Sequence, residues 1–519
     1  MDFVKKTRAK LAGALIQTAR KIQASGYDRH GASYRKNALR GMGATAGDAD
    51  SDIVENLETL RIRSRDLFMG SPMATGALKT IRTNVVGSGL KLNAQIDYKA
   101  LGMTEEEAKA WEEKTEREWR YWSESTNCDL ERRLNFSQLQ SLAVLSALLS
   151  GDVFVTLPLR ERVGDPYKLR VGLIEADRVC TPPRGSVETK NSVIDGIEID
   201  DDGATVAFWI ANKHPKVYSV LLGKKPEQLK FTRVEAYGSK SGRPNVLHLM
   251  ADAERPAQRR GVPLLAPVVE ALWQLENYSN SELMSAVISS MFTVFIKSKN
   301  PEDGLNTQFM GDLPPSDLYE GDLKLGNGSI VSLAPDEDIQ IADPKRPNQA
   351  FEGFVKAICR EIGTALELPY ELLIKNFEGS YSSSRASLLE AWRMFRMRRS
   401  WLISSFCQPI YEEWLADAVA SGRIEAKGFF DDPVIRKAWC GADWFGDSQG
   451  QLDPLKEANA AKIRVEEGFS TREREAAELT GMQYEVIESQ RYREEQFRKE
   501  HGLTESTQSP ISEEETEES

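Results

Sequence analysis

The sequence is poor in the residues that build disulfides, metal centres and catalytic dyads. It has five cysteines, at positions 128, 180, 359, 407 and 440, and only four histidines, and it contains no Cys-x-x-Cys pair. An odd number of widely separated cysteines predicts neither a disulfide framework nor a zinc site. Unpaired cysteines suit a reducing compartment, so we expect the chain to fold in a cytoplasm.

Long hydrophobic runs are also lacking. The most apolar stretch, Leu283 to Ile296, contains three serines, and it is shorter than the roughly 20 apolar residues that a bilayer requires. The basic N-terminus has no apolar core followed by a small-residue cleavage site. We therefore expect no membrane span and no secretory signal.

Negative charge outweighs positive charge overall, because 79 Asp and Glu stand against 67 Lys and Arg and the formal net charge is -12. Proteins that hold nucleic acid tightly usually present a basic domain, so the balance argues against static binding but leaves room for passing DNA. The exception is residues 1–45, where ten Lys or Arg face two Asp; this basic arm is either solvated or contacts capsid, scaffold or DNA. The tail 502–519 has six Glu and no Lys or Arg, which predicts disorder.

Motifs for chemistry are mostly absent. There is no P-loop and no His-Glu-x-x-His. Gly446-Asp-Ser-Gln-Gly450 matches the nucleophile-elbow string, but no β-branched run precedes it and only His501 follows, which favours a plain loop. His248 lies in an expected strand, where a structural role is favoured over a catalytic one. Three acidic clusters are interpreted as turn residues rather than two-metal nuclease ligands: Asp200-Asp201-Asp202, Asp336-Glu337-Asp338 and Asp431-Asp432.

Periodicity and turn signals predict an α+β fold. The expected helices are Asp50–Arg82 with a break at Gly70 and Pro72, Thr104–Trp122, Phe136–Leu149, Pro263–Ser290, Gln349–Leu366, Arg385–Phe406, and a helical block 452–500 broken at Gly468 and Gly481. The expected strands are Val153–Leu159, Lys168–Ile174, Ile194–Ile199, Ala204–Ile210, Val246–Met250, Thr293–Lys297, Ser329–Leu333 and Ile339–Ile341.

One basic cluster lies on the helix that begins at Arg385. Arg393, Arg396 and Arg399 recur every three residues, with Arg398 beside them. Such a row is either a solvated edge next to an apolar face or an ion-pairing surface for a neighbouring subunit or for phosphates.

Several segments carry a resemblance. They are Val246-Leu-His-Leu-Met250 with Glu254–Pro263, then Glu367-Leu-Pro-Tyr-Glu-Leu-Leu373 with Asn376–Glu390, and more weakly Glu467–Glu473, Arg35–Arg40 and Asn84–Gly89. Together they closely resemble lambda-type bacteriophage portal proteins over roughly residues 30–500. The resemblance implies a ring of about twelve subunits, closed by a head-to-tail interface.

The resemblance also implies the portal fold, an α+β chain with wing, long-helix stem, small β-rich clip and helical crown. Its implied boundaries are the arm 1–45, wing 46–262, stem helix 263–292, clip 293–346, stem helix 347–373, tunnel loop 374–384, long helix and remaining wing 385–451, crown 452–501 and acidic tail 502–519.

Residue roles follow only from that resemblance. The DNA-facing tunnel loop would hold Asn376, Glu378, Gly379, Ser380, Tyr381, Ser382 and Ser383. Ion-pairing or DNA-proximal groups would be Lys375, Arg393, Arg396 and Arg399. The stem and subunit interface would use Leu265, Val268, Leu272, Leu275, Phe351, Phe354 and Ile358. Terminase would dock on the clip residues Phe309, Leu313, Leu318 and Tyr319.

The implied function is passive and needs no cofactor or metal. The ring would guide double-stranded DNA during packaging by the terminase motor, retain and eject it, attach the tail and nucleate procapsid assembly. Its implied partners are further copies of itself, the terminase large subunit, the major capsid protein and scaffold, and a head-tail connector protein. We expect it in the virion, and in the host cytoplasm during assembly. The alternatives are a metal-dependent nuclease or hydrolase, and a monomeric binding module.

Overall fold

The computed structural model describes residues 47–183, 189–215, 229–290, 294–298, 337–341, 351–377, 380–448, 454–482 and 484–501, together with Asn37 and Leu503. The chain divides into two compact units, Met1–Asp52 and Ile53–Ser519. The first unit contributes only the start of a helix to the described residues, and the contacts reported below lie within the second.

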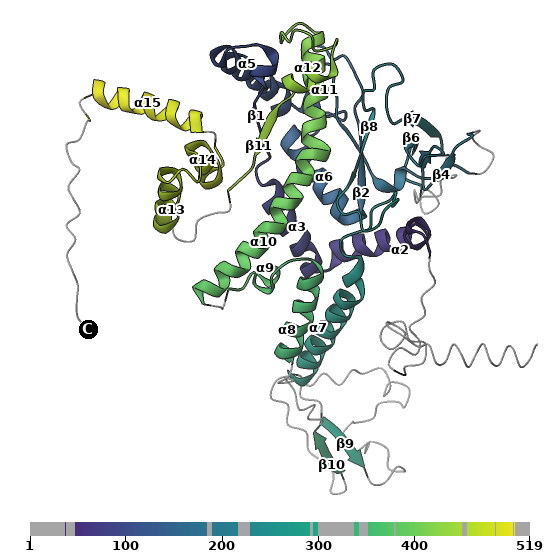
Figure 1. Cartoon of the computed structure of the whole chain (residues 1–519). Coiled ribbons are helices and arrows are strands. Elements are labelled where there is room, and N and C mark those ends of the chain that lie inside the picture. Colours follow the sequence, from purple (N-terminus) through teal and green to yellow (C-terminus); the bar gives the residue numbers. More distant parts are fainter. Residues whose placement is uncertain are drawn as a thin grey trace, which may run out of the picture. The chain divides into compact units, whose positions relative to one another are not determined.

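Within the described residues, runs of helices are separated by groups of short antiparallel strands (Figure 1). The helices are α2 (Ala49–Gly70), α3 (Pro72–Val86), α4 (Tyr98–Leu101), α5 (Glu105–Glu124), α6 (Phe136–Ser150), α7 (Val269–Ser290), α8 (Phe351–Ala365), α9 (Tyr370–Ile374), α10 (Tyr381–Leu402), α11 (Gln408–Ala420), α12 (Pro433–Trp439), α13 (Pro454–Glu466), α14 (Arg472–Thr480) and α15 (Tyr484–Glu500). The strands are β1 (Lys91–Ala94), β2 (Asp152–Thr156), β3 (Gly172–Ile174), β4 (Ser192–Ile194), β5 (Ile197–Ile199), β6 (Thr205–Ala211), β7 (Phe231–Glu235), β8 (Val246–Met250), β9 (Val294–Ser298), β10 (Glu337–Ile341) and β11 (Ala442–Phe445).

Two antiparallel sheets follow α6, in the orders β3-β2-β8 and β4-β5-β6-β7. The main core lies where α3, α5, α6, α10 and α11 pack together, and Trp119 is at its centre. The Trp119 ring lies 5.0 to 5.8 Å from the rings of Trp122, Phe136, Tyr411, Trp414 and Trp444. Trp119 lies on α5, whereas α11 and β11 follow about 300 residues later in the chain. The core is therefore completed by segments that are distant in sequence.

Several sequence predictions are confirmed at the level of secondary structure. The break at Gly70 and Pro72 separates α2 from α3, and Pro72 occupies the first turn of α3. Thr104 caps α5 in a reciprocal capping box with Glu107. Gly468 and Gly481 interrupt the C-terminal helices, and both adopt positive φ.

Other predictions need correction. The strand predicted at Ile194–Ile199 is a hairpin instead, because Asp195 and Gly196 both adopt positive φ and form a tight turn between β4 and β5. The strand predicted at Lys168–Ile174 shortens to β3. Three strands, β1, β7 and β11, were not predicted; β1 and β11 pair only with each other, at opposite ends of the sequence.

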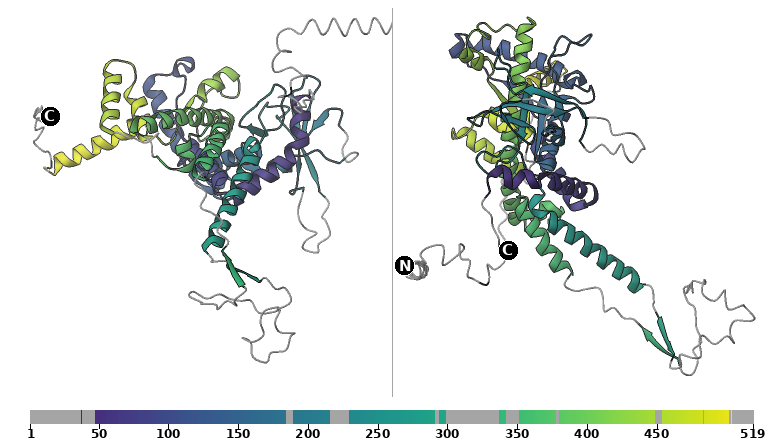
Figure 2. Two further views of the ribbon diagram at one scale, coloured as in Figure 1. Left: turned by 90° about the horizontal axis from the view of Figure 1, so that it is seen from below. Right: turned by 90° about the vertical axis from the view of Figure 1, so that its right-hand side faces the viewer.

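The helix predicted from Pro263 begins later. A 3-10 turn at Ala266–Val268 precedes α7, because Pro267 has no N–H to donate to a regular helical bond. The regular part, α7, is therefore about 33 Å long rather than about 40 Å. It runs beside α8 (Figure 2). In the sequence, β9 follows α7 and β10 precedes α8, and these two strands pair with each other.

The helix predicted at Arg385–Phe406 is longer than expected. It begins at Tyr381 behind the N-cap Ser380 and continues through a π-helical turn, Ile403–Cys407, into α11. In that turn the Gln408 N–H donates to the Ile403 carbonyl, five residues back. Pro409 has no N–H for an ordinary helical bond, which explains why the wider turn precedes it.

Candidate channel-facing and assembly surfaces

The segment between α9 and α10 is short and mostly polar, and its one aromatic residue, Phe377, is 48% exposed. Lys375 ends α9 in the left-handed region, with φ of 57°, and both it and Asn376 are exposed. Ser380 caps α10 by accepting from the Ser383 N–H. The predicted loop is thus cut short at its C-terminal side, because Tyr381, Ser382 and Ser383 belong to the helix. Glu378 and Gly379 lie outside the described residues.

The basic residues of α10 divide into two exposed and two engaged side chains. Arg393 and Arg396 are exposed, and Arg393 pairs at 3.0 Å with Glu390, itself exposed. Arg396 lines a cavity of about 780 Å³ between α10, α13 and α14. These two side chains can meet a phosphate or a neighbouring subunit.

Arg399 is a structural residue. Its guanidinium donates to the carbonyls of Asn84 and Val85 at 3.0 Å, and so caps the end of α3. It also donates to the Asp447 carbonyl and lies over the Trp392 ring, 5.4 Å from its centroid. Burial lowers the pKa of Arg399, and the nearby Asp447 opposes that shift. A side chain with these contacts holds α3, α10 and the segment after β11 together.

Arg398 is also engaged. It is buried, and it pairs with Asp252 at 3.0 Å and with Glu367 at 3.7 Å. Asp252 follows β8 and Glu367 follows α8. Arg398 therefore ties α10 to the segment that follows β8 and to the segment that follows α8.

The residues predicted for the stem interface fall into two groups. Leu265, Val268, Leu272 and Leu275 are buried in the chain's own core. Phe351 and Ile358 are half-buried, and Phe354 is 51% exposed. The Tyr278 ring packs against Phe351 and Phe354, with ring centroids 5.3 and 5.1 Å apart. The four aliphatic residues therefore join α7 to this chain, and of the predicted interface residues Phe354 on α8 is the most exposed.

The predicted clip residues Phe309, Leu313, Leu318 and Tyr319 lie outside the described residues. The structure describes only the two strands that frame this insert. Their register pairs Val294 with Ile341 and Ser298 with Glu337.

A buried ion network lies where β2 meets the segment before α7. Asp152 is fully buried, and it accepts from Arg260 at 2.7 Å, from Arg61 at 3.0 Å and from the Gly261 N–H at 3.1 Å. Burial alone would raise the pKa of Asp152, but the charges of Arg260 and Arg61 outweigh it and hold that pKa well below its usual range. The carboxylate is thus ionised and fully satisfied.

Arg260 extends this network. It is fully buried, and it also pairs with Asp195 at 2.6 Å and donates to the carbonyls of Val179 and Ala176. The network therefore joins α2, β2, the β4–β5 turn and the segment leading to α7. Sequence analysis missed it, although Asp152 at the head of an apolar strand was the available signal, since a buried charge requires a partner.

His248 belongs to the same network. Its Nε2 lies 3.2 Å from Asp152, and its ring stacks on Phe154 with centroids 4.4 Å apart. These are structural contacts, and the histidine has no second catalytic partner among the contacts of this network.

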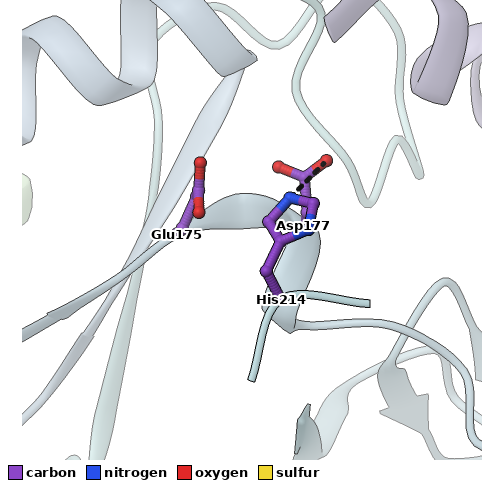
Figure 3. Close-up of side chains that lie close together, drawn as sticks. All are labelled: Glu175, Asp177 and His214. Atoms are coloured by element: carbon purple, nitrogen blue, oxygen red, sulfur yellow. Dashed lines mark ion pairs between the residues drawn. The ribbon is translucent and has the colours of Figure 1, made fainter. Parts of the chain in front are cut away.

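One group of acidic and histidine side chains in the described residues has the spacing of metal ligands: Glu175, Asp177 and His214 (Figure 3). Arg65 forms ion pairs with both of its carboxylates, the contact with Glu175 being 3.3 Å. Burial would raise the pKa of Asp177, but its hydrogen bond to Arg65 lowers it. A guanidinium already neutralises this cluster, so its geometry is that of an ion pair rather than a cation site.

The predicted acidic clusters have turn or capping roles where they are described. Asp200 accepts from the backbone of Asp202 and Ala204 in the β5–β6 turn, and Asp432 caps α12. Asp336 lies outside the described residues. For the Gly446 string one expectation was wrong, because the strand β11 does precede it. The described residues after that strand, Gly446 to Ser448, are not helical, which agrees with the predicted loop.

In the described residues, no helix is both long and apolar enough to cross a bilayer. 

Comparison with known proteins identifies the family. Residues 35–399 match the family model of the phage portal protein, lambda family. The chain is 25% identical over 500 residues to portal protein B of Escherichia phage lambda, covering 92% of this chain and 91% of that one. It is 25% identical to the portal protein of Escherichia phage N15, over 90% and 89% of the two chains. A probable portal protein of Halomonas phage phiHAP-1 is 26% identical over 82% and 77%.

Among solved structures, a chain from the neck of an empty gene transfer agent (GTA) particle is 12% identical, with a TM-score of 0.46 over 85% of this chain and 96% of that one. A chain from the virion of a native particle has a TM-score of 0.40 at 13% identity, over 74% and 93%.

Because the family model covers more than half of the chain, this protein belongs to the lambda family of phage portal proteins. It is a structural, non-enzymatic protein of the virion. The resemblance inferred from the sequence motifs is thereby confirmed, and the alternative of an enzyme is set aside.

Proposed function

We propose that this chain assembles head-to-tail into a ring at one vertex of the capsid, and that viral DNA passes through the ring. The observation that carries the proposal is the family match over residues 35–399. The ring would serve packaging by the terminase motor, retention and ejection of DNA, tail attachment through a connector protein, and nucleation of the procapsid with the major capsid protein and scaffold.

The α7–α8 pair supports the stem assignment. Two antiparallel helices carry their inner aliphatic residues into the chain's own core and leave exposed faces outward. A closed ring requires a heterologous interface, in which two different surfaces of each subunit meet. The insert between these helices would be the clip that docks terminase, through Phe309, Leu313, Leu318 and Tyr319.

The connection between α9 and α10 is proposed as the tunnel loop. Apart from the exposed Phe377, its residues are small or polar, and the charges of Lys375 and Glu378 offset each other. Few phosphate contacts mean little counterion release, so DNA can slide past such a loop. Lys375 on the loop, and Arg393 and Arg396 exposed on the following helix, would be the cations close to passing phosphates.

Electron microscopy of the purified full chain tests the ring. We expect end-on views of a closed ring of about twelve subunits with a central hole. If only monomers or dimers are seen, alone and together with scaffold and capsid protein, the proposal fails.

The loop assignment has its own test in the double variant G379D/S380D. We expect rings to assemble as in the wild type, whereas the yield of particles filled with DNA falls because the added carboxylates repel phosphates. The double variant G379N/S380N is the matched uncharged control. Loss of the ring itself in the acidic variant would contradict this placement of the loop.

A further inference from the structure

Three polar groups lie inside the aromatic core around Trp119. They are the hydroxyls of Thr115 and Tyr411 and the indole N–H of Trp414, and all three side chains are fully buried. None of these three atoms has a hydrogen-bond partner among the described residues. We propose that one buried water molecule binds between α5 and α11 and bridges these three groups. The inference concerns the core of a single subunit, so it does not depend on the proposed ring.

Buried polar groups without a partner are rare, because each one costs free energy. About nine in ten buried polar groups in folded proteins bond to another protein group or to ordered water. A threonine inside a helix often donates to the carbonyl four residues back, but the Thr115 hydroxyl does not. Three unpartnered groups around one tryptophan are more simply explained by one shared partner than by three separate defects.

The position of Thr115 on α5 is set by its neighbours. Trp111, Thr115 and Trp119 follow one another at spacings of four, so their side chains share one face of the helix. The Trp119 ring packs edge-on against Tyr411 of α11, with centroids 5.6 Å apart. The Trp111 ring packs against Trp439 of α12 at 4.9 Å. Thr115 therefore lies between the two ring contacts that hold α11 and α12 beside α5 (Figure 1).

Electrostatic neighbours locate the Tyr411 hydroxyl. Burial raises the pKa of Tyr411 well above its usual range. Acidic groups add to this shift, in the order Cys440, Glu116 and Glu112. Such effects weaken with distance, so these groups lie near the phenolic oxygen. Glu112 and Glu116 flank Thr115 on α5, and Cys440 directly follows α12. The Tyr411 hydroxyl is thus directed toward the level of Thr115, although no direct hydrogen bond joins the two.

Trp414 supplies the third group. It lies one turn after Tyr411 on α11, and the two rings are stacked with centroids 6.0 Å apart. It also packs edge-on against Trp119 at 5.2 Å. The indole nitrogen can only donate, whereas each hydroxyl can donate and accept. One water molecule can accept from Trp414 and from one hydroxyl and donate to the other, which is about the three bonds that buried waters make.

The surroundings select a neutral ligand. A cation would find no lone pair on the indole N–H of Trp414. An anion would lie near the carboxylates of Glu112 and Glu116 in a medium of low dielectric constant, where like charges repel strongly. Water offers donors and acceptors without a charge. Bound here, it would join α5 to α11, which are separated by about 300 residues of the chain.

Thermal unfolding of the full-length chain tests the bridge through the sign of the change. T115V and Y411F each remove one polar atom with little change in shape. With a bridging water, each variant leaves the water and the remaining groups without one bond, so we expect Tm to fall by about 1–3 °C. Without it, each variant removes an unpartnered polar group, and Tm would rise or stay the same. A rise or no change in either variant overturns the inference.

The double variant T115V/Y411F tests whether the two groups share one partner. We expect its loss of Tm to be smaller than the sum of the two single losses, because the first substitution already weakens the water site. Additive losses would overturn the shared water. Y121F is the matched control, because Tyr121 lies on α5 and is 55% exposed; its Tm should equal that of the wild type.

A density map of the full chain that shows ordered solvent provides the direct test. We expect a solvent peak about 3 Å from Thr115 Oγ1, Tyr411 Oη and Trp414 Nε1. Two hydroxyls bonded directly to each other, or a map of ordered solvent with no peak between the three atoms, would overturn the inference.

Discussion

The buried ion network of Asp152, Arg260 and Arg61 forms a joint between α2, β2 and the segment before α7. This joint and the exposed side of α10 use charged residues in opposite ways. At the joint, Asp152 and Arg260 are fully buried and each is satisfied by several partners. On α10, Arg393 and Arg396 are exposed, and the ion pair of Arg393 with Glu390 is open to solvent. The difference indicates that the joint stabilises the subunit, whereas the exposed side of α10 is available to molecules outside it.

The largest expected effect is at the joint. D152A removes the carboxylate and leaves Arg260 and Arg61 buried without their main counter-charge. Loss of one partner of a buried pair costs about 3–5 kcal/mol, and denaturant unfolding of the monomer would measure it. E390A, which breaks the exposed pair with Arg393, is the matched control and should cost no more than about 1 kcal/mol. Equal costs would remove the contrast between the two regions.

The joint should also respond to acid. The pKa of Asp152 in the folded chain lies below its ordinary value of 3.8. Between those two values the unfolded chain binds a proton that the folded chain does not, so stability falls as the pH drops below about 4. The pH dependence of unfolding between pH 5 and 2 should therefore be shallower in D152N than in the wild type. An unchanged slope would show that Asp152 is not the group responsible.

Glycines give the next comparison. The backbones of Gly151 and Gly261 touch, so a Cβ at either position would collide with the carbonyl of the other, and Gly151 has a φ of 91°. G261A should cost about 1–3 kcal/mol, because the backbone must shift. G76A is the control: the Cβ would meet nothing within 4 Å in α3, and alanine should stabilise that helix by up to about 1 kcal/mol. Thermal unfolding of both variants measures these changes. A stabilised G261A would contradict the close approach of the Gly151 and Gly261 backbones.

The sequence predicted local elements better than it predicted contacts. Capping residues and glycines define α5 and the C-terminal breaks locally, so Thr104, Gly468 and Gly481 could be interpreted without tertiary information. The β1–β11 pair and the role of Arg399 depend on segments more than 300 residues apart, which no local pattern reveals. The row Arg393, Arg396 and Arg399 looked uniform, but helical periodicity cannot tell which members of a row another segment will cover.

The same row provides the finest comparison. R399A removes the donors that cap the carbonyls of Asn84 and Val85, and should cost about 1–3 kcal/mol because those acceptors lose their partner. R396A removes an exposed side chain and should change stability by no more than about 0.5 kcal/mol. Denaturant unfolding of the two monomers measures this difference.

In DNA packaging by assembled rings, we expect R396A to have a larger effect than R399A, the reverse of their order in stability. Packaging is measured at a temperature where both variants are folded. R396A lacks a cation proposed to lie near passing phosphates. The yield of particles filled with DNA should therefore change less with salt concentration in R396A than in the wild type. R399A should keep the wild-type salt dependence, because its guanidinium is already committed to α3 and Trp392. If R399A alone altered the salt dependence, Arg399 rather than Arg396 would be the residue that meets DNA, and the division of this helix into an engaged and an exposed side would be wrong.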